Sequence, residues 1–195
     1  MRTNIVRILF IAFTLSACNS QTKSNDSQKD SSLFLNEYIQ LGDSALNLVG
    51  KGVLTPDVTE DSFFNLMDKS LGGVAFETAR ATCKDGLING LFYISRSTNE
   101  VDSFQVKVGK LFSNLCAKYG KPVKDSTYVE REGDIIAKHY EHIYEWRTAT
   151  KVVSVTMVKN ELYALGGGEM YIMRASVGLQ DSIVKKHNLT NLFYK

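Results

Sequence analysis

Apolar residues recur at spacings of three and four in three stretches of the chain, which is typical of amphipathic helices. The clearest stretch covers residues 99–118, and Gly120 follows it as a helix stop. Its apolar side chains form one stripe about 100° wide, made of Val101, Phe104, Val108, Leu111, Phe112, Leu115 and Tyr119. Weaker patterns predict helices over residues 33–49 and 57–71, the second ended by Gly72-Gly73.

Strands are predicted on both sides of the long helix. Residues 74–82 and 87–95 are joined through Asp85-Gly86, a pair that supplies the positive φ angles of a tight hairpin turn. Gly166-Gly167-Gly168 is predicted as a loop, because phosphate-binding glycine loops lead into a helix and this one leads into a strand. The elements that follow the long helix are strands near residues 126–131, 135–147, 151–158 and 169–176, then a short helix over residues 179–187.

The order of these elements predicts an α+β fold. Consecutive strands with short connections pair antiparallel, and helices between them can cover only one face. We therefore expect an antiparallel sheet of five or six strands with helices packed on one face, formed by residues 33–195 as a single domain. The 44% content of apolar residues is that of a folded protein.

The N-terminus has the pattern of a secretory signal. Two arginines precede an apolar run at residues 8–15, which is too short to span a bilayer. The string Leu15-Ser16-Ala17-Cys18 resembles the lipobox of bacterial lipoproteins. The resemblance implies a signal peptide of residues 1–17, a lipid attached at Cys18, and a location in the bacterial cell envelope.

The residues after Cys18 refine this expectation. Asn19 is not the aspartate that holds lipoproteins at the inner membrane in the enterobacterial pattern, so the resemblance implies the outer membrane. Residues 19–32 contain no apolar side chain and predict a flexible tether of up to about 45 Å. Removing residues 1–17 takes two of the 23 basic side chains and none of the 21 acidic ones, which leaves 21 of each. A neutral mature chain argues against a nucleic-acid partner.

His139 and Glu141 are the candidate acid and base. They lie two positions apart in a predicted strand, so their side chains share one face, and Glu145 shares it too. His139 and His142 are three apart and point to opposite faces, so the sequence predicts no metal site. It also shows no cofactor motif and no nucleophile motif. The alternative interpretation is a charged outer face of a sheet without catalytic function.

Tyr140, Tyr144 and Trp146 line the other face of that predicted strand at period two. One interpretation is an aromatic platform for a small ligand. The other is part of the core beneath the helices, which the size of the rings favours.

Cys83 and Cys116 are candidates for a disulfide. A helix over residues 99–118 that folds back along the preceding strand brings both thiols to the same end of the molecule. Export also places them where disulfides persist. However, a helix stands about 10 Å from a sheet, and bridged Cα atoms lie within roughly 7 Å of each other. Two unpaired thiols are therefore the alternative.

Together these patterns predict a non-enzymatic envelope lipoprotein whose domain binds a protein partner or an envelope component. The membrane is contacted through the lipid anchor. Two alternatives stay open at this point: an envelope hydrolase that uses His139 and Glu141, and a small-ligand binder that uses the aromatic strand face.

Overall fold

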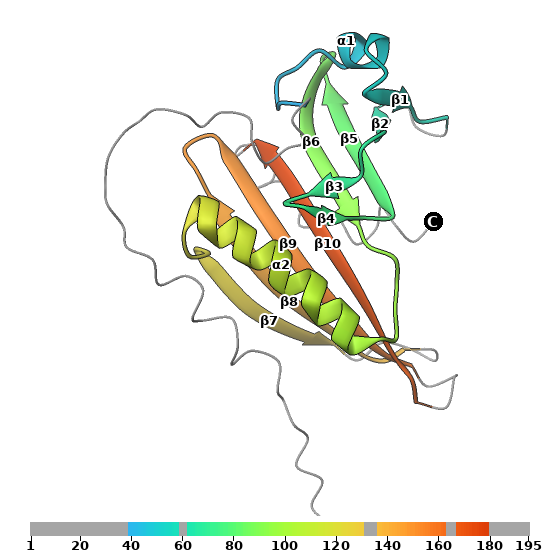
Figure 1. Ribbon diagram of the computed structural model, residues 1–195, viewed down its shortest axis with the longest axis vertical. Helices are drawn as coiled ribbons and strands as arrows, with labels where there is room; N and C mark the ends of the chain where they lie inside the picture. Colours follow the sequence, from blue (N-terminus) through green and yellow to red (C-terminus); the bar gives the residue numbers. More distant parts are fainter. Residues whose placement is uncertain (1–38, 59–61, 131–135, 163–166, 180–195) are drawn as a thin grey trace, which may run out of the picture.

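The computed structural model describes residues 39–58, 62–130, 136–162 and 167–179, and Figure 1 shows how their elements are arranged. Eight of the strands form one sheet in the order β1-β2-β5-β6-β10-β9-β8-β7, in which every neighbouring pair is antiparallel. The remaining two strands, β3 and β4, form a separate hairpin. The strands are β1 (Leu54–Pro56), β2 (Phe63–Leu66), β3 (Ser70–Leu71), β4 (Val74–Ala75), β5 (Thr78–Lys84), β6 (Leu87–Ile94), β7 (Lys124–Glu130), β8 (Ile136–Arg147), β9 (Lys151–Leu162) and β10 (Glu169–Leu179), and the helices are α1 (Ala45–Gly50) and α2 (Val101–Tyr119).

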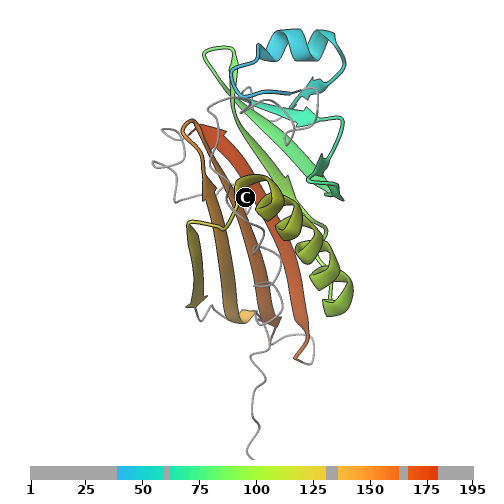
Figure 2. The same ribbon diagram turned by 60° about the vertical axis from the view of Figure 1, so that its left-hand side comes forward.

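The long helix α2 lies against one side of the long strands β8, β9 and β10 (Figure 2). We call this side of strands β7 to β10 the helix face and the opposite side the outer face. The Phe104 ring of α2 contacts the Tyr171 ring of β10, with centroids 5.3 Å apart. Phe112 contacts Tyr144 and Trp146 of β8 at 4.7 and 5.7 Å. The apolar stripe of α2 is therefore buried against aromatic side chains of the sheet.

Two local predictions from the sequence are confirmed. The β5–β6 hairpin turns at Asp85 and Gly86, whose φ angles are 54° and 78°. The long helix ends at Gly120, which has a φ angle of 77°. The Gly120 carbonyl accepts a hydrogen bond of 3.0 Å from Trp146 Nε1, so the end of α2 is fixed to β8.

The helix predicted over residues 57–71 is wrong, although residues 59–61 lie outside the described part. Residues 63–66 form β2, which pairs with both β1 and β5, and Ser70–Leu71 form β3. Gly72 and Gly73 do not end a helix. Their φ angles of 55° and 70° make the two-residue turn between β3 and β4, where Leu71 is paired with Val74.

The helix predicted over residues 33–49 is also wrong within its described part, since only Ala45–Gly50 are helical. Gly42 has a φ angle of 95°, and its amide donates to the Ile88 carbonyl of β6 at 2.7 Å. A helix interior requires negative φ, so the chain turns here and begins a helix only at Ser44, whose side chain caps it.

The expected fold class needs the same correction. The protein is mainly β, with an eight-stranded sheet where five or six strands were expected, and with one long helix where a layer of helices was expected. The antiparallel pairing and the four strands after α2 agree with the sequence patterns. Of the tail helix predicted over residues 179–187, only Leu179 is described, and it ends β10. In the described ranges no helix is long and apolar enough to cross a membrane.

Candidate functional site

The structure brings the candidate acid and base together on the outer face of β8. His139 Nε2 lies 3.0 Å from Glu141 Oε1. His139 Nδ1 lies 2.7 Å from Oδ1 of Asn160, the residue directly opposite it on β9. Arg174 of β10 reaches the same Glu141 oxygen at 3.6 Å. The pair is therefore part of a four-residue polar cluster that spans three strands.

The contacts of this cluster do not favour catalysis. Both ring nitrogens of His139 are engaged within the sheet, whereas a general base needs one lone pair directed at its substrate. The third candidate, Glu145, is occupied by Arg147, whose Nε lies 2.6 Å from its carboxylate. Both His139 and Asn160 are buried. These residues satisfy one another in place, as buried polar groups usually do.

The aromatic face of β8 belongs to the core. Tyr144 and Trp146 are 3% and 1% exposed, because α2 covers them. Tyr140 lies further along β8, where Lys159 Nζ stands 5.3 Å from its ring centroid. A ligand platform built on the three rings therefore does not exist, and the interpretation as core is correct for Tyr144 and Trp146.

A second histidine site was missed in the sequence. His142 Nδ1 lies 2.8 Å from Thr127 Oγ1, and its Nε2 lies 2.7 Å from Asp125 Oδ1 without the alignment of a hydrogen bond. His142 is buried on the helix face, where its ring packs on Tyr144 at 4.5 Å. Thr127 and Asp125 come from the neighbouring strand β7, so only the register of β7 against β8 reveals this contact.

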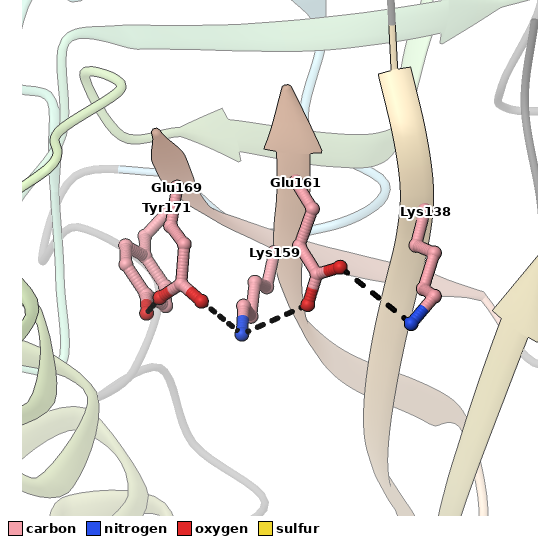
Figure 3. A network of polar contacts seen from close by, with 5 residues as sticks. All are labelled: Lys138, Lys159, Glu161, Glu169 and Tyr171. Carbon is pink, nitrogen blue, oxygen red and sulfur yellow. Dashed lines mark hydrogen bonds and ion pairs between the residues drawn. The ribbon is translucent and has the colours of Figure 1, made fainter. Parts of the chain in front are cut away.

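A chain of alternating charges crosses the helix face near the start of α2 (Figure 3). Lys138 of β8 lies 3.8 Å from Glu161 of β9, which lies 3.4 Å from Lys159. Lys159 Nζ lies 2.6 Å from Glu169 of β10, and the Tyr171 hydroxyl donates to the same Glu169 carboxylate. Two cations and two carboxylates neutralise one another. The chain links three strands and leaves no net charge for a ligand.

These contacts change the proton affinities of their members. The hydrogen bonds from Lys159 and then from Tyr171 lower the pKa of Glu169. Burial alone would lower the pKa of Lys159, but its hydrogen bond and charge interaction with Glu169, followed by those with Glu161, raise it overall. Burial, and then the hydrogen bond to Glu169, raise the pKa of Tyr171. Each shift favours the protonation state that keeps the chain intact.

A shallow cavity of about 330 Å³ lies beside the first turn of α2. Its lining includes the charged residues Arg96, Lys107 and Glu100 and the buried apolar residues Phe104 and Met173. None of the residues predicted to carry chemistry lines it. A hydrolase that uses His139 and Glu141 would need both groups in such a hollow, and this one does not contain them.

The candidate disulfide between Cys83 and Cys116 is not formed, since Cys83 is a free thiol. Cys83 is a free, half-buried thiol on β5. Cys116 is buried on α2, and α2 packs on β8 and β10 instead of folding back over the β5–β6 hairpin. The assumed packing partner of the helix was therefore wrong. Of the predicted glycine loop, Gly167 and Gly168 are described, and they lead into β10 as expected.

Strand β7 is the longer of the two edge strands in the described sheet, with seven residues against three in β1. It pairs with β8 on one side and is the last strand in the order. Three apolar side chains in or next to it are more than half exposed: Val123, Tyr128 and Val129. An edge strand presents unpaired backbone amides and carbonyls, which makes it a template for pairing with another chain.

No known protein-family model matches the chain, and no curated protein is significantly similar to it. Within the ranges that the structure describes, no three His, Cys, Asp or Glu side chains are grouped so that they could hold a metal ion.

Proposed function

We propose that this protein is a lipoprotein of the bacterial cell envelope, held at the outer membrane through Cys18, whose folded domain binds another protein and has no catalytic role. The resemblance of residues 15–18 to a lipobox supports the anchor. The contacts of His139 and His142 support binding over catalysis. Both ring nitrogens of His139 and Nδ1 of His142 are engaged within the sheet, and His142 Nε2 lies 2.7 Å from the Asp125 carboxylate.

The single observation that carries the binding function is the exposed edge of β7. Main-chain hydrogen bonds along a sheet edge give affinity for an extended partner segment, and the flanking side chains give specificity. Val129 is 52% exposed, and Val123 and Tyr128 are exposed beside it. A partner that adds a strand to β7 covers these side chains and satisfies the edge.

The anchor is tested by replacing Cys18 with Ser in the full chain. The variant is expected to accumulate as unprocessed precursor or as a soluble form, whereas the wild type fractionates with outer membranes. Cys83→Ser is the matched control, because Cys83 is a thiol of the folded domain and its loss should leave fractionation unchanged. Normal processing and membrane association of Cys18→Ser would show that the lipobox interpretation is wrong.

The binding function is tested by affinity purification of the full protein from solubilised membranes. A specific protein is expected to co-purify with the wild type and to be lost with Val129→Lys, which puts a charge beside the β7 edge. Val106→Lys is the matched control, since Val106 is the same residue type and is also more than half exposed but lies on α2. Recovery of no specific protein, or equal recovery with both variants, would contradict a role for β7.

A further inference from the structure

We propose that the partner at β7 is a second copy of this chain, and that two β7 strands pair antiparallel about a two-fold axis at Thr127. This inference rests on the proposed function, because it identifies the protein that the β7 edge binds. Three observations carry it: the contrast between the two edges of the sheet, the self-complementary charges of β7, and the placement of α2.

The two edges of the sheet differ in their protection. β1 has three residues and ends with Pro56, which has no amide hydrogen to donate. β7 has seven residues, contains no proline, and follows β8 from Lys124 to Glu130 without a bulge. Short strands, prolines, bulges and charged side chains are the usual devices that prevent pairing at an edge. β1 has the first two, whereas β7 has only charged side chains, which are Lys124, Asp125 and Glu130.

The sequence of β7 is complementary to itself. Antiparallel strands related by a two-fold axis normal to the sheet place each residue opposite one of the same parity, so the axis must pass through a residue. Only an axis at Thr127 pairs all seven residues of β7. The same register sets Lys124 opposite Glu130 of the second copy, and the symmetry repeats that pair. Opposite charges directly across a strand pair stabilise it.

Lys124 is available for this role. In the described part of the chain Lys124 makes no ion pair. Glu145 lies opposite Lys124 on β8, but the Glu145 carboxylate is paired with Arg147 at 2.6 Å. In the same register the exposed Val129 faces Asp125 of the second copy, so strand pairing covers an apolar side chain on the helix face.

The helices do not obstruct this arrangement. A two-fold axis normal to the sheet keeps the α2 helices of both copies on the same side, and α2 lies over β8 to β10, which leaves the β7 edge clear (Figures 1 and 2). The two eight-stranded sheets then form one continuous sheet. Anchoring two copies to the same membrane would raise their effective concentration, which favours an interface made of one strand from each copy.

The register is tested by disulfide trapping with the full lipidated protein in detergent. Thr127→Cys should give a covalent dimer on mild oxidation, because the two copies of residue 127 face each other with Cα atoms about 5 Å apart. Asp125→Cys alone should not, because its two copies are offset by four residues, or about 13 Å. Mixing Asp125→Cys with Val129→Cys protein should restore trapping, since these two positions are opposite. Wild-type protein controls for the native cysteines.

The charge pairs are tested by measuring the dissociation constant through light scattering or sedimentation. Lys124→Glu should weaken dimerisation about tenfold, since it turns two attractive pairs into repulsive ones. The double variant Lys124→Glu/Glu130→Lys should restore it, which separates a loss of pairing from a loss of folding. A failure of the double variant to restore the dimer would overturn the register.

The remaining outcomes are equally decisive. The pairing would be overturned if the wild-type protein is monomeric at all concentrations and the Thr127→Cys variant gives no covalent dimer. Equal trapping of Asp125→Cys and Thr127→Cys would overturn it as well. Co-purification of a different protein in that case would still support the proposed function. The two proposals can therefore fail separately.

Discussion

Replacing Phe112 with Ala is the sharpest test of how α2 is held on the sheet. The ring is buried and contacts Tyr144 at 4.7 Å and Trp146 at 5.7 Å. Truncating a buried phenylalanine costs about 3–5 kcal/mol, including aromatic contacts worth about 0.5–1.5 kcal/mol each. We expect a loss of about 4 kcal/mol in the free energy of unfolding. Domains of this size are stable by about 5–15 kcal/mol, so the variant should fold but with a small margin.

The assay is urea unfolding followed by tryptophan fluorescence. The chain contains one tryptophan, Trp146, so the signal reports directly on the contact between α2 and β8. With a slope of about 2 kcal/mol per molar urea, the expected loss lowers the midpoint by about 2 M. Circular dichroism in parallel separates a change in stability from a change in the local fluorescence of Trp146.

The control for Phe112→Ala is Val106→Ala on the same helix. Val106 is 72% exposed, and its truncation should change stability by no more than about 0.5 kcal/mol. A midpoint for Phe112→Ala within about 0.3 M of the wild type, or equal losses in the two variants, would refute the packing of α2 on β8.

Two other substitutions test local features of the sheet. Glu169→Gln should cost less than about 1 kcal/mol at pH 7, because its ion pair with Lys159 is partly exposed. The pKa of Glu169 is lowered in the folded protein, so the ion pair stabilises the fold above the ordinary pKa of 4.5. This stabilisation is lost as the pH falls through the pKa of Glu169 in the folded protein. The stabilities of variant and wild type should therefore converge in acid. Gly90→Ala should destabilise by about 1–3 kcal/mol, because the added Cβ would lie 2.8 Å from Thr82 Oγ1, and a thermal melt checks this. Gly109→Ala in α2 meets no atom within 4 Å and should be neutral or stabilising, and an equal loss in both glycine variants would contradict the steric argument.

The sequence predicted an element correctly where its pattern was long or its turn chemistry specific. The seven apolar positions of residues 101–119 fit only a helix, and Asp85-Gly86 fits only a tight turn. The stretch of residues 57–71 was short, and its apolar spacing was coincidental: Met67 is exposed, whereas Leu71 is buried. Tandem glycines such as Gly72-Gly73 mark a turn, but they do not identify the element that the turn ends.

The candidate site shows the same limit at longer range. Period two correctly placed His139 and Glu141 on one face, and the structure brings them to 3.0 Å. Their other partners, Asn160 and Arg174, come from strands whose register depends on loop lengths and core packing. No pattern in a single sequence defines that register. The failed disulfide has the same origin, because it assumed a packing partner for α2 that the sequence does not specify.

The connection made by α2 explains why β7 is the exposed edge. The chain leaves the sheet at the end of β6, crosses the helix face through α2, and re-enters as β7, after which β8, β9 and β10 fill the space back to β6. Four strand spacings separate β6 from β7, or about 19 Å, and the 19 residues of α2 extend about 28 Å. The helix is thus long enough to cross the sheet diagonally and deliver the chain to its far side. Within the described residues no later strand covers β7, the first strand after this crossing, so the burial of α2 and the exposure of β7 result from the same connection.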